Sequence, residues 1–98
     1  MLLAQQGADV IKIEPSDGDW SRVLGSVYGD HTAYSIIANL GKRGIAIDLK
    51  QERSQSIIDK LVTQADVFIE GFRPGVIDRL GYAYERLRAI NPRLIYLS

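Results

Sequence analysis

A short apolar run that ends in glycines, a proline and an arginine constrains the fold of this 98-residue chain more than any other feature. Residues 65–69 (Ala-Asp-Val-Phe-Ile) are too few for a helix and are followed by a turn signal, which predicts a buried strand. Pro74 and Gly75 cannot continue this strand, because proline has no amide donor for the sheet and glycine adopts backbone angles that other residues resist. In open parallel α/β sheets, ligands bind beyond the carboxyl ends of the strands. The sequence therefore predicts a binding crevice at this turn.

The hydrophobic periodicity of the rest of the chain predicts an α/β fold. Strand 44–49, helix 51–64 and strand 65–69 form a βαβ unit, in which the strands run parallel and the crossover is right-handed. The further helices are expected at residues 1–6, 32–40, 76–80 and 84–90, and the further strands at 8–14 and 94–97. A parallel sheet with helices packed against it follows from this order.

A turn-rich loop at residues 16–30 interrupts this order. Loops of this length within a compact domain are commonly functional or mobile. Trp20 and Tyr28 lie within it, and we expect both rings to pin the loop to the core rather than to stack on a substrate.

Both ends of the chain fall inside predicted elements. The first residues read as the last turns of an apolar helix, and the final strand is followed only by Ser98. We therefore expect residues 1–98 to be one part of a domain that is truncated at both ends.

Composition excludes several classes of function. Twelve basic residues balance twelve acidic ones, so no net field attracts nucleic acid or an anionic membrane. The chain has no cysteine and a single histidine, His31, which excludes thiolate chemistry and multi-histidine metal sites. No apolar run reaches the roughly 20 residues that a membrane span needs. These features predict a soluble, cytoplasmic protein without a metal site.

Three predicted strand ends supply polar groups to one edge of the sheet. They are Glu14-Pro15, residues 48–50 and residues 70–73. Gly71 would let a ligand approach the backbone closely, and Arg73 and Arg79 could bind phosphate through their planar guanidinium groups. These residues predict an anion site at the sheet edge.

These strand ends do not by themselves define a catalyst or a particular ligand. The chain lacks G-x-G-x-x-G and the G-x-x-x-x-G-K-[ST] loop, which argues against the usual dinucleotide and triphosphate cradles. Nothing pairs a nucleophile with a base, and Glu14, Asp48 and Glu70 fit ordinary loop caps as well as catalysts. Arg73 and Arg79 fit surface ion pairs as well as phosphate ligands.

Five segments together resemble the amino-terminal region of the family III CoA-transferases, the CaiB/BaiF group. They occur in order and with compatible spacings, and they cover nearly the whole chain. The segments are residues 7–15 with Gly18-Asp19, 39–50, 65–75, 78–81 and 91–96.

This resemblance implies a Rossmann-like large domain in a homodimer of two ring-shaped subunits threaded through each other. It implies transfer of CoA from an acyl-CoA to a free carboxylic acid, through a downstream aspartate that forms a mixed anhydride and then a thioester. Coenzyme A and acyl-CoA are then substrates, with no prosthetic group and no catalytic residue among these 98. The alternatives are an α-methylacyl-CoA racemase of the same fold, whose histidine and aspartate also lie downstream, and a non-catalytic fragment that binds CoA or another nucleotide.

The resemblance also carries the family's CoA contacts onto positions of this chain. Arg73 and Arg79 would neutralise phosphate through paired hydrogen bonds, and Lys50 would act as a point charge. Two positions depart from the pattern, because Pro15 stands where some relatives carry a basic residue and Gly71 where others carry asparagine. The implied contacts are Ile47, Asp48, Leu49, Lys50, Gly71, Phe72, Arg73 and Arg79.

Overall fold

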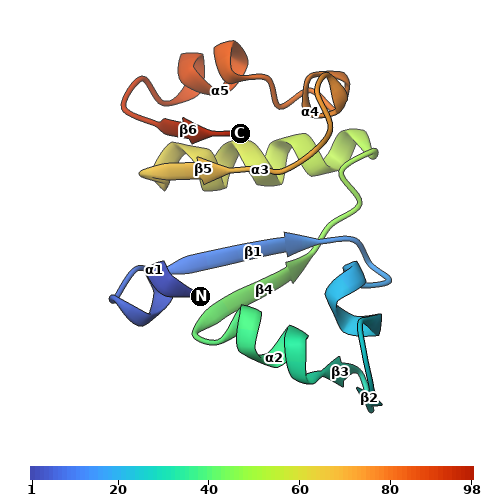
Figure 1. The fold of residues 1–98 in the computed structure, drawn as a ribbon. Coiled ribbons are helices and arrows are strands. Elements are labelled where there is room, and N and C mark those ends of the chain that lie inside the picture. Colours follow the sequence, from blue (N-terminus) through green and yellow to red (C-terminus); the bar gives the residue numbers. More distant parts are fainter. The chain divides into compact units, whose positions relative to one another are not determined.

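The computed structural model describes residues 1–98 and combines helices with three two-stranded sheets, of which two are parallel and one is antiparallel (Figure 1). The chain divides into two compact units, the amino-terminal unit Met1–Asp48 and the carboxy-terminal unit Leu49–Ser98. Each unit contains its own pair of parallel strands. The α/β class predicted from the sequence is confirmed.

Parallel pairing of β1 with β4 organises the amino-terminal unit. Its elements are α1 (Leu2–Gln5), β1 (Val10–Glu14), the 3-10 turn η1 (Trp20–Val23), β2 (Val27–Tyr28), β3 (His31–Thr32), α2 (Ala33–Asn39) and β4 (Lys42–Ala46). Val10 lies opposite Lys42 and Glu14 opposite Ala46. The Ile47 amide extends the ladder by donating to the Glu14 carbonyl at 2.9 Å. The strand predicted at 44–49 therefore begins and ends earlier than expected.

Buried hydroxyl groups fix the start of α2. The Thr32 hydroxyl accepts a hydrogen bond from the Ser35 amide at 3.0 Å, and the Ser35 hydroxyl accepts one from the Thr32 amide at 2.9 Å. This reciprocal arrangement satisfies two amides that the helix itself leaves unpaired. The Thr32 hydroxyl also donates to the Ser21 carbonyl at 2.7 Å, which ties η1 to the helix.

The loop at residues 16–30 does not bury its aromatic rings. Trp20 is 66% exposed and Tyr28 70% exposed, so the prediction that both rings pin the loop to the core is wrong in this chain. Trp20 instead packs against Tyr34 of α2 at the surface, with 5.7 Å between the ring centroids. Polar contacts from Ser21 and Thr32 hold the loop, and these leave no recognisable hydrophobic pattern in the sequence.

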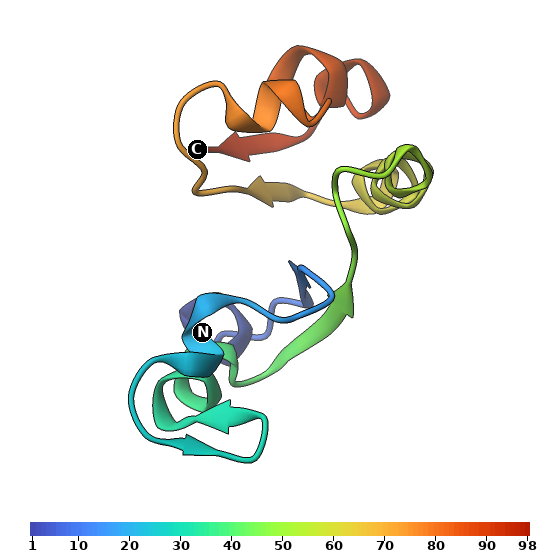
Figure 2. The same ribbon diagram turned by 90° about the vertical axis from the view of Figure 1, so that its right-hand side faces the viewer.

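The carboxy-terminal unit places helices against a second parallel pair. Its elements are α3 (Glu52–Gln64), β5 (Val67–Ile69), α4 (Val76–Arg79), α5 (Tyr84–Ile90) and β6 (Ile95–Leu97). Figure 2 views α3 nearly along its axis. Phe68 of β5 lies opposite Tyr96 of β6, and their rings stack at 5.1 Å. All five elements match the order predicted from the sequence.

Helices α3 and α5 share the core of this unit. Arg86 of α5 pairs with Asp59 of α3 at 2.7 Å. The Asn91 side chain donates to the carbonyl oxygens of Val62 and Ala65 at 3.0 and 2.8 Å, so the end of α5 also closes the end of α3. The buried apolar side chains of the unit are Ile58, Val62, Ile77, Tyr82, Leu87 and Leu94.

One face of the β5–β6 pair is not covered in this chain. The exposed fractions of Val67, Ile69, Ile95 and Leu97 lie between 43% and 64%. The prediction that strand 65–69 is buried is therefore wrong for this face. Parallel sheets are normally covered on both faces, and here the Phe68 and Tyr96 side chains lie on the partly buried face.

No helix in this structure combines the length and apolar character that crossing a bilayer requires.

Candidate functional site

A tight turn at the carboxyl end of β5 shapes the candidate site. The Phe72 amide donates to the Glu70 carboxylate at 2.8 Å, which starts the turn. Gly75 then adopts a left-handed conformation, with φ +79°, directly before α4. A side chain at Gly75 would begin 3.6 Å from the Arg79 guanidinium. The turn predicted from the glycines and the proline is confirmed.

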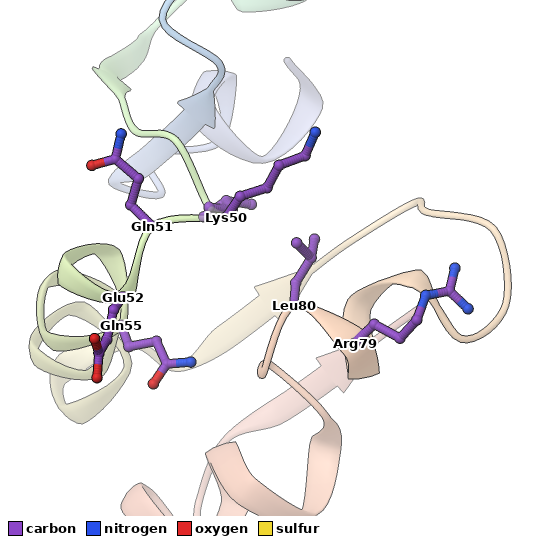
Figure 3. Close-up of a pocket in the computed structure, with 7 residues that line it drawn as sticks. Lys50, Gln51, Glu52, Gln55, Arg79 and Leu80 are labelled. Carbon is purple, nitrogen blue, oxygen red and sulfur yellow. The ribbon is translucent and has the colours of Figure 1, made fainter.

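A cavity of about 330 Å³ lies in the carboxy-terminal unit (Figure 3). Its side chains come from the segment before α3, from the first turn of α3 and from the end of α4. Lys50 and Arg79 contribute positive charge, while Leu49 and Leu80 contribute apolar surface. The lining residues are Leu49, Lys50, Gln51, Glu52, Gln55, Arg79 and Leu80. The two cations outnumber the single carboxylate of Glu52, and together with the two apolar side chains they suit an anion that carries an apolar or aromatic group.

The cavity brings together three of the residues predicted as CoA contacts. Leu49 and Lys50 precede α3, and Arg79 is the last residue of α4, yet all three line the same space. The two ends of the lining are therefore far apart in the chain and adjacent in the fold.

The other predicted contacts lie outside this lining. Gly71, Phe72 and Arg73 are exposed on the loop between β5 and α4. Ile47 and Asp48 belong to the amino-terminal unit, where Ile47 is buried.

Sequence reasoning missed the glutamines and the glutamate of the cavity wall. Gln51, Glu52 and Gln55 follow the strand end at Lys50 directly, at spacings that place Gln51 and Gln55 one helical turn apart. The sequence did offer one signal for these residues. Polar residues at positions i and i+4 directly after a candidate ligand-binding strand end could have predicted that they line the site.

A second polar cluster lies at the carboxyl end of β1. Arg22 donates two hydrogen bonds to the Glu14 carboxylate, from Nε at 3.1 Å and from Nη2 at 2.6 Å. Lys12 pairs with both Glu14 and Asp19, and the Asp19 amide donates to Glu14 at 3.3 Å. Glu14 is thus the centre of a network that holds η1 to β1, rather than a simple loop cap. The sequence analysis did not identify Arg22.

The cations of this cluster lower the pKa of both carboxyl groups. Hydrogen bonds from Arg22 are the largest influence on Glu14 and lower its pKa, although burial acts in the opposite direction. Burial would by itself raise the pKa of Asp19, but hydrogen bonds from Lys12 and Ser21 together outweigh it and lower that pKa. The cluster therefore favours the ionised form of both acids.

Acid should weaken the attachment of η1 to β1. Because the folded-state pKa of Glu14 and Asp19 lies below the unfolded value of about 4, their contribution to stability is present above about pH 4. That contribution is lost as the pH falls through the lowered folded-state values. We expect Arg22→Gln to shift the acid-unfolding midpoint upward, measured by fluorescence of Trp20, the only tryptophan of the chain. An unchanged midpoint would show that the pair does not stabilise the folded unit.

No group of three or more histidine, cysteine, aspartate or glutamate side chains in the structure could hold a metal ion.

Comparison with known proteins gives a consistent result over the whole chain. The sequence matches CoA-transferase family III across residues 1–98. It is 49% identical over 98 residues to an acetyl-CoA:oxalate CoA-transferase from Acetobacter aceti, covering 99% of this chain and 25% of that protein. It is 41% identical to a formyl-CoA:oxalate CoA-transferase from Streptomyces avermitilis, covering 99% of this chain and 24% of that one. The chain thus spans about a quarter of the length of the curated relatives it matches.

A solved structure agrees in both fold and sequence. The crystal structure of a CAIB/BAIF family protein from Brucella suis superimposes with a TM-score of 0.87 at 42% sequence identity, covering 96% of this chain and 26% of that one. The match extends over both the β1–β4 and the β5–β6 halves of the sequence. The chain belongs to CoA-transferase family III.

Proposed function

We propose that this chain is the amino-terminal, CoA-binding part of an enzyme that moves coenzyme A from an acyl-CoA to a free carboxylic acid. Membership of CoA-transferase family III supports the reaction class. The two relatives described above are named for a CoA thioester and a carboxylic acid, oxalate, which supports the same pair of substrate classes here. The observation that carries the proposal is the cavity that Lys50 and Arg79 line together with the apolar side chains of Leu49 and Leu80.

In this proposal the positively charged residues of the cavity bind the phosphate groups of CoA, and the apolar residues contact its adenine ring. Arg79 offers a planar fork of donors to a phosphate group, and Lys50 adds a mobile point charge. Leu49 and Leu80 offer apolar surface to the adenine ring. The phosphorylated adenosine end of CoA combines these two chemistries, so we assign it to this cavity.

The remaining predicted contacts complete the proposed binding surface. Gly71 allows close approach to its backbone, and Arg73 supplies a second guanidinium on the exposed loop before α4. Phe72 offers an exposed ring on the same loop. Ile47 and Asp48 of the amino-terminal unit remain predicted CoA contacts. In this proposal the chain forms part of a Rossmann-like domain of a cytoplasmic homodimer.

The chemistry of transfer falls to residues outside this chain. The thioester bond between the first acyl group and the CoA sulfur breaks, and the same sulfur forms a thioester with the second acid, while the first acid leaves as a carboxylate. The part played by these 98 residues is to hold CoA while its sulfur exchanges partners. Binding energy from the remote nucleotide can then contribute to positioning the thioester.

An isotope-exchange assay on the full-length protein tests this function. Acyl-CoA that is labelled in its CoA portion is incubated with an unlabelled acceptor acid. We expect the labelled CoA to appear as a thioester of the acceptor acid. Deuterium entering the α-carbon of a 2-methylacyl-CoA without any acceptor acid would instead identify a racemase. Tight CoA binding with neither reaction would identify a binding protein and contradict the proposal.

A further inference from the structure

We propose that Gln55 is a specificity-determining residue that hydrogen-bonds the 6-amino edge of the adenine ring, an inference that rests on the function proposed above. Gln55 lies in α3, one helical turn after Gln51, and its half-buried side chain lines the cavity. Figure 3 shows this side chain leaving α3 on the side of Leu80. Gln55 lines the same cavity as Lys50 and Arg79.

Gly81 leaves room for the Gln55 amide. A side chain at Gly81 would begin 2.7 Å from Nε2 of Gln55, closer than real contacts allow. Gly81 has φ +89° and its amide donates to the Asp78 carbonyl at 3.0 Å, so this backbone conformation is held by the end of α4. A larger residue at position 81 would therefore displace the end of the Gln55 side chain.

The Gln55 amide is available to a ligand. It makes no hydrogen bond within the chain, whereas Gln51, the other glutamine of the lining, already has an interaction there. A glutamine amide places one donor and one acceptor side by side. It is the uncharged polar group that the cavity can offer to a ligand.

Adenine presents the matching pattern. Its 6-amino group donates a hydrogen bond beside a ring nitrogen that accepts one, and glutamine binds this pair through both atoms of its amide. Leu49 and Leu80 provide the apolar surface that the faces of a purine require, and the charges of Lys50 and Arg79 are suited to phosphate. The base and the phosphates of a phosphorylated adenosine thus have counterparts in the lining, and Gln55 is the one that distinguishes bases.

Calorimetric titration of the full-length protein with two ligands tests this inference. The ligands are adenosine 3′,5′-bisphosphate and the matching purine riboside bisphosphate, which differs only in lacking the 6-amino group. The unmodified protein should bind the adenosine ligand about tenfold more tightly. Gln55→Leu removes two hydrogen bonds from the adenosine ligand and one from the purine ligand, so it should lower affinity by up to about a hundredfold for the first and up to about tenfold for the second. The preference then disappears.

Two further variants separate recognition from folding. Gln55→Met keeps the length of the side chain and should behave as Gln55→Leu does. Gln64→Leu changes an exposed glutamine at the other end of α3 and should keep the full preference. An unchanged preference in both Gln55 variants, or an equal loss of affinity for both ligands, would overturn the role of Gln55 while leaving the proposed function intact. Failure of the unmodified protein to bind either ligand, or CoA itself, would overturn the proposed function and this inference together.

Discussion

Replacing Arg79 with alanine is expected to weaken binding of CoA to the full-length protein by about tenfold to a hundredfold. A hydrogen bond to a charged partner contributes about 1.5–3 kcal/mol, and Arg79 can form two such bonds to one phosphate. Arg79 is exposed and has no ion pair in the chain, so its loss should affect the ligand far more than the fold. Calorimetric titration with CoA measures the effect directly.

Two variants make the result specific to the geometry of the cavity. Arg79→Lys keeps the charge but loses the planar fork, so its affinity should fall between those of the unmodified protein and Arg79→Ala. Arg93→Ala removes an exposed arginine of the same unit that lies outside the cavity lining, and should bind CoA normally. If Arg79→Ala bound CoA as tightly as Arg93→Ala did, Arg79 would be an ordinary surface arginine.

Replacing Leu87 with alanine is expected to destabilise the carboxy-terminal unit by about 2–5 kcal/mol. Leu87 is completely buried in α5, and α5 packs against α3. Truncation removes apolar contacts and leaves a cavity that the surrounding helices fill only in part. Hydrogen exchange of the α3 and α5 amides should then accelerate by about thirtyfold or more in the full-length protein, because every 1.4 kcal/mol corresponds to a factor of ten.

Changes of other kinds on the same helix should have small effects. Leu87→Met conserves the volume of the side chain and should lower the free energy of unfolding by less than about 1.5 kcal/mol. Glu85→Ala changes an exposed residue of α5 and should cost about 0.5 kcal/mol or less. Equal exchange rates in Leu87→Ala and Glu85→Ala would contradict the assignment of Leu87 to the core.

Local sequence signals accounted for the main helices and the four strands of the parallel pairs, but not for η1, β2 and β3. The turn at Gly75 requires left-handed backbone and was predicted from the glycine and the proline before it. Helix α3 was predicted at 51–64 and observed at Glu52–Gln64, since its apolar periodicity is long enough to exclude a strand. Such features depend on residues close together in the chain, which is why the sequence reveals them.

Features that depend on contacts between distant residues were harder to predict. The Arg22–Glu14 pair joins a loop to a strand end. The sequence around either residue does not predict that the other is its partner. Burial of strand 65–69 was predicted from its apolar residues, but Val67 and Ile69 are exposed because nothing in this chain covers that face. Composition indicates which side chains favour burial. It does not show which helix or strand, if any, covers them.

Three of the seven residues that line the cavity were predicted as CoA contacts. The family resemblance named Leu49, Lys50 and Arg79, and the guanidinium of Arg79 was also predicted from the sequence as a phosphate ligand. Gln55 was missed, because its amide lies beside Gly81, which is 26 residues further along the chain. Close approach of this kind is visible only in three dimensions.

A crystal structure of the full-length protein with CoA would test the central claim most directly. We predict density for the adenine ring between Leu49 and Leu80, with phosphate oxygens within hydrogen-bond distance of Arg79 and Lys50. Density for the nucleotide at another surface, with this cavity occupied only by water, would contradict the assignment of the cavity to CoA.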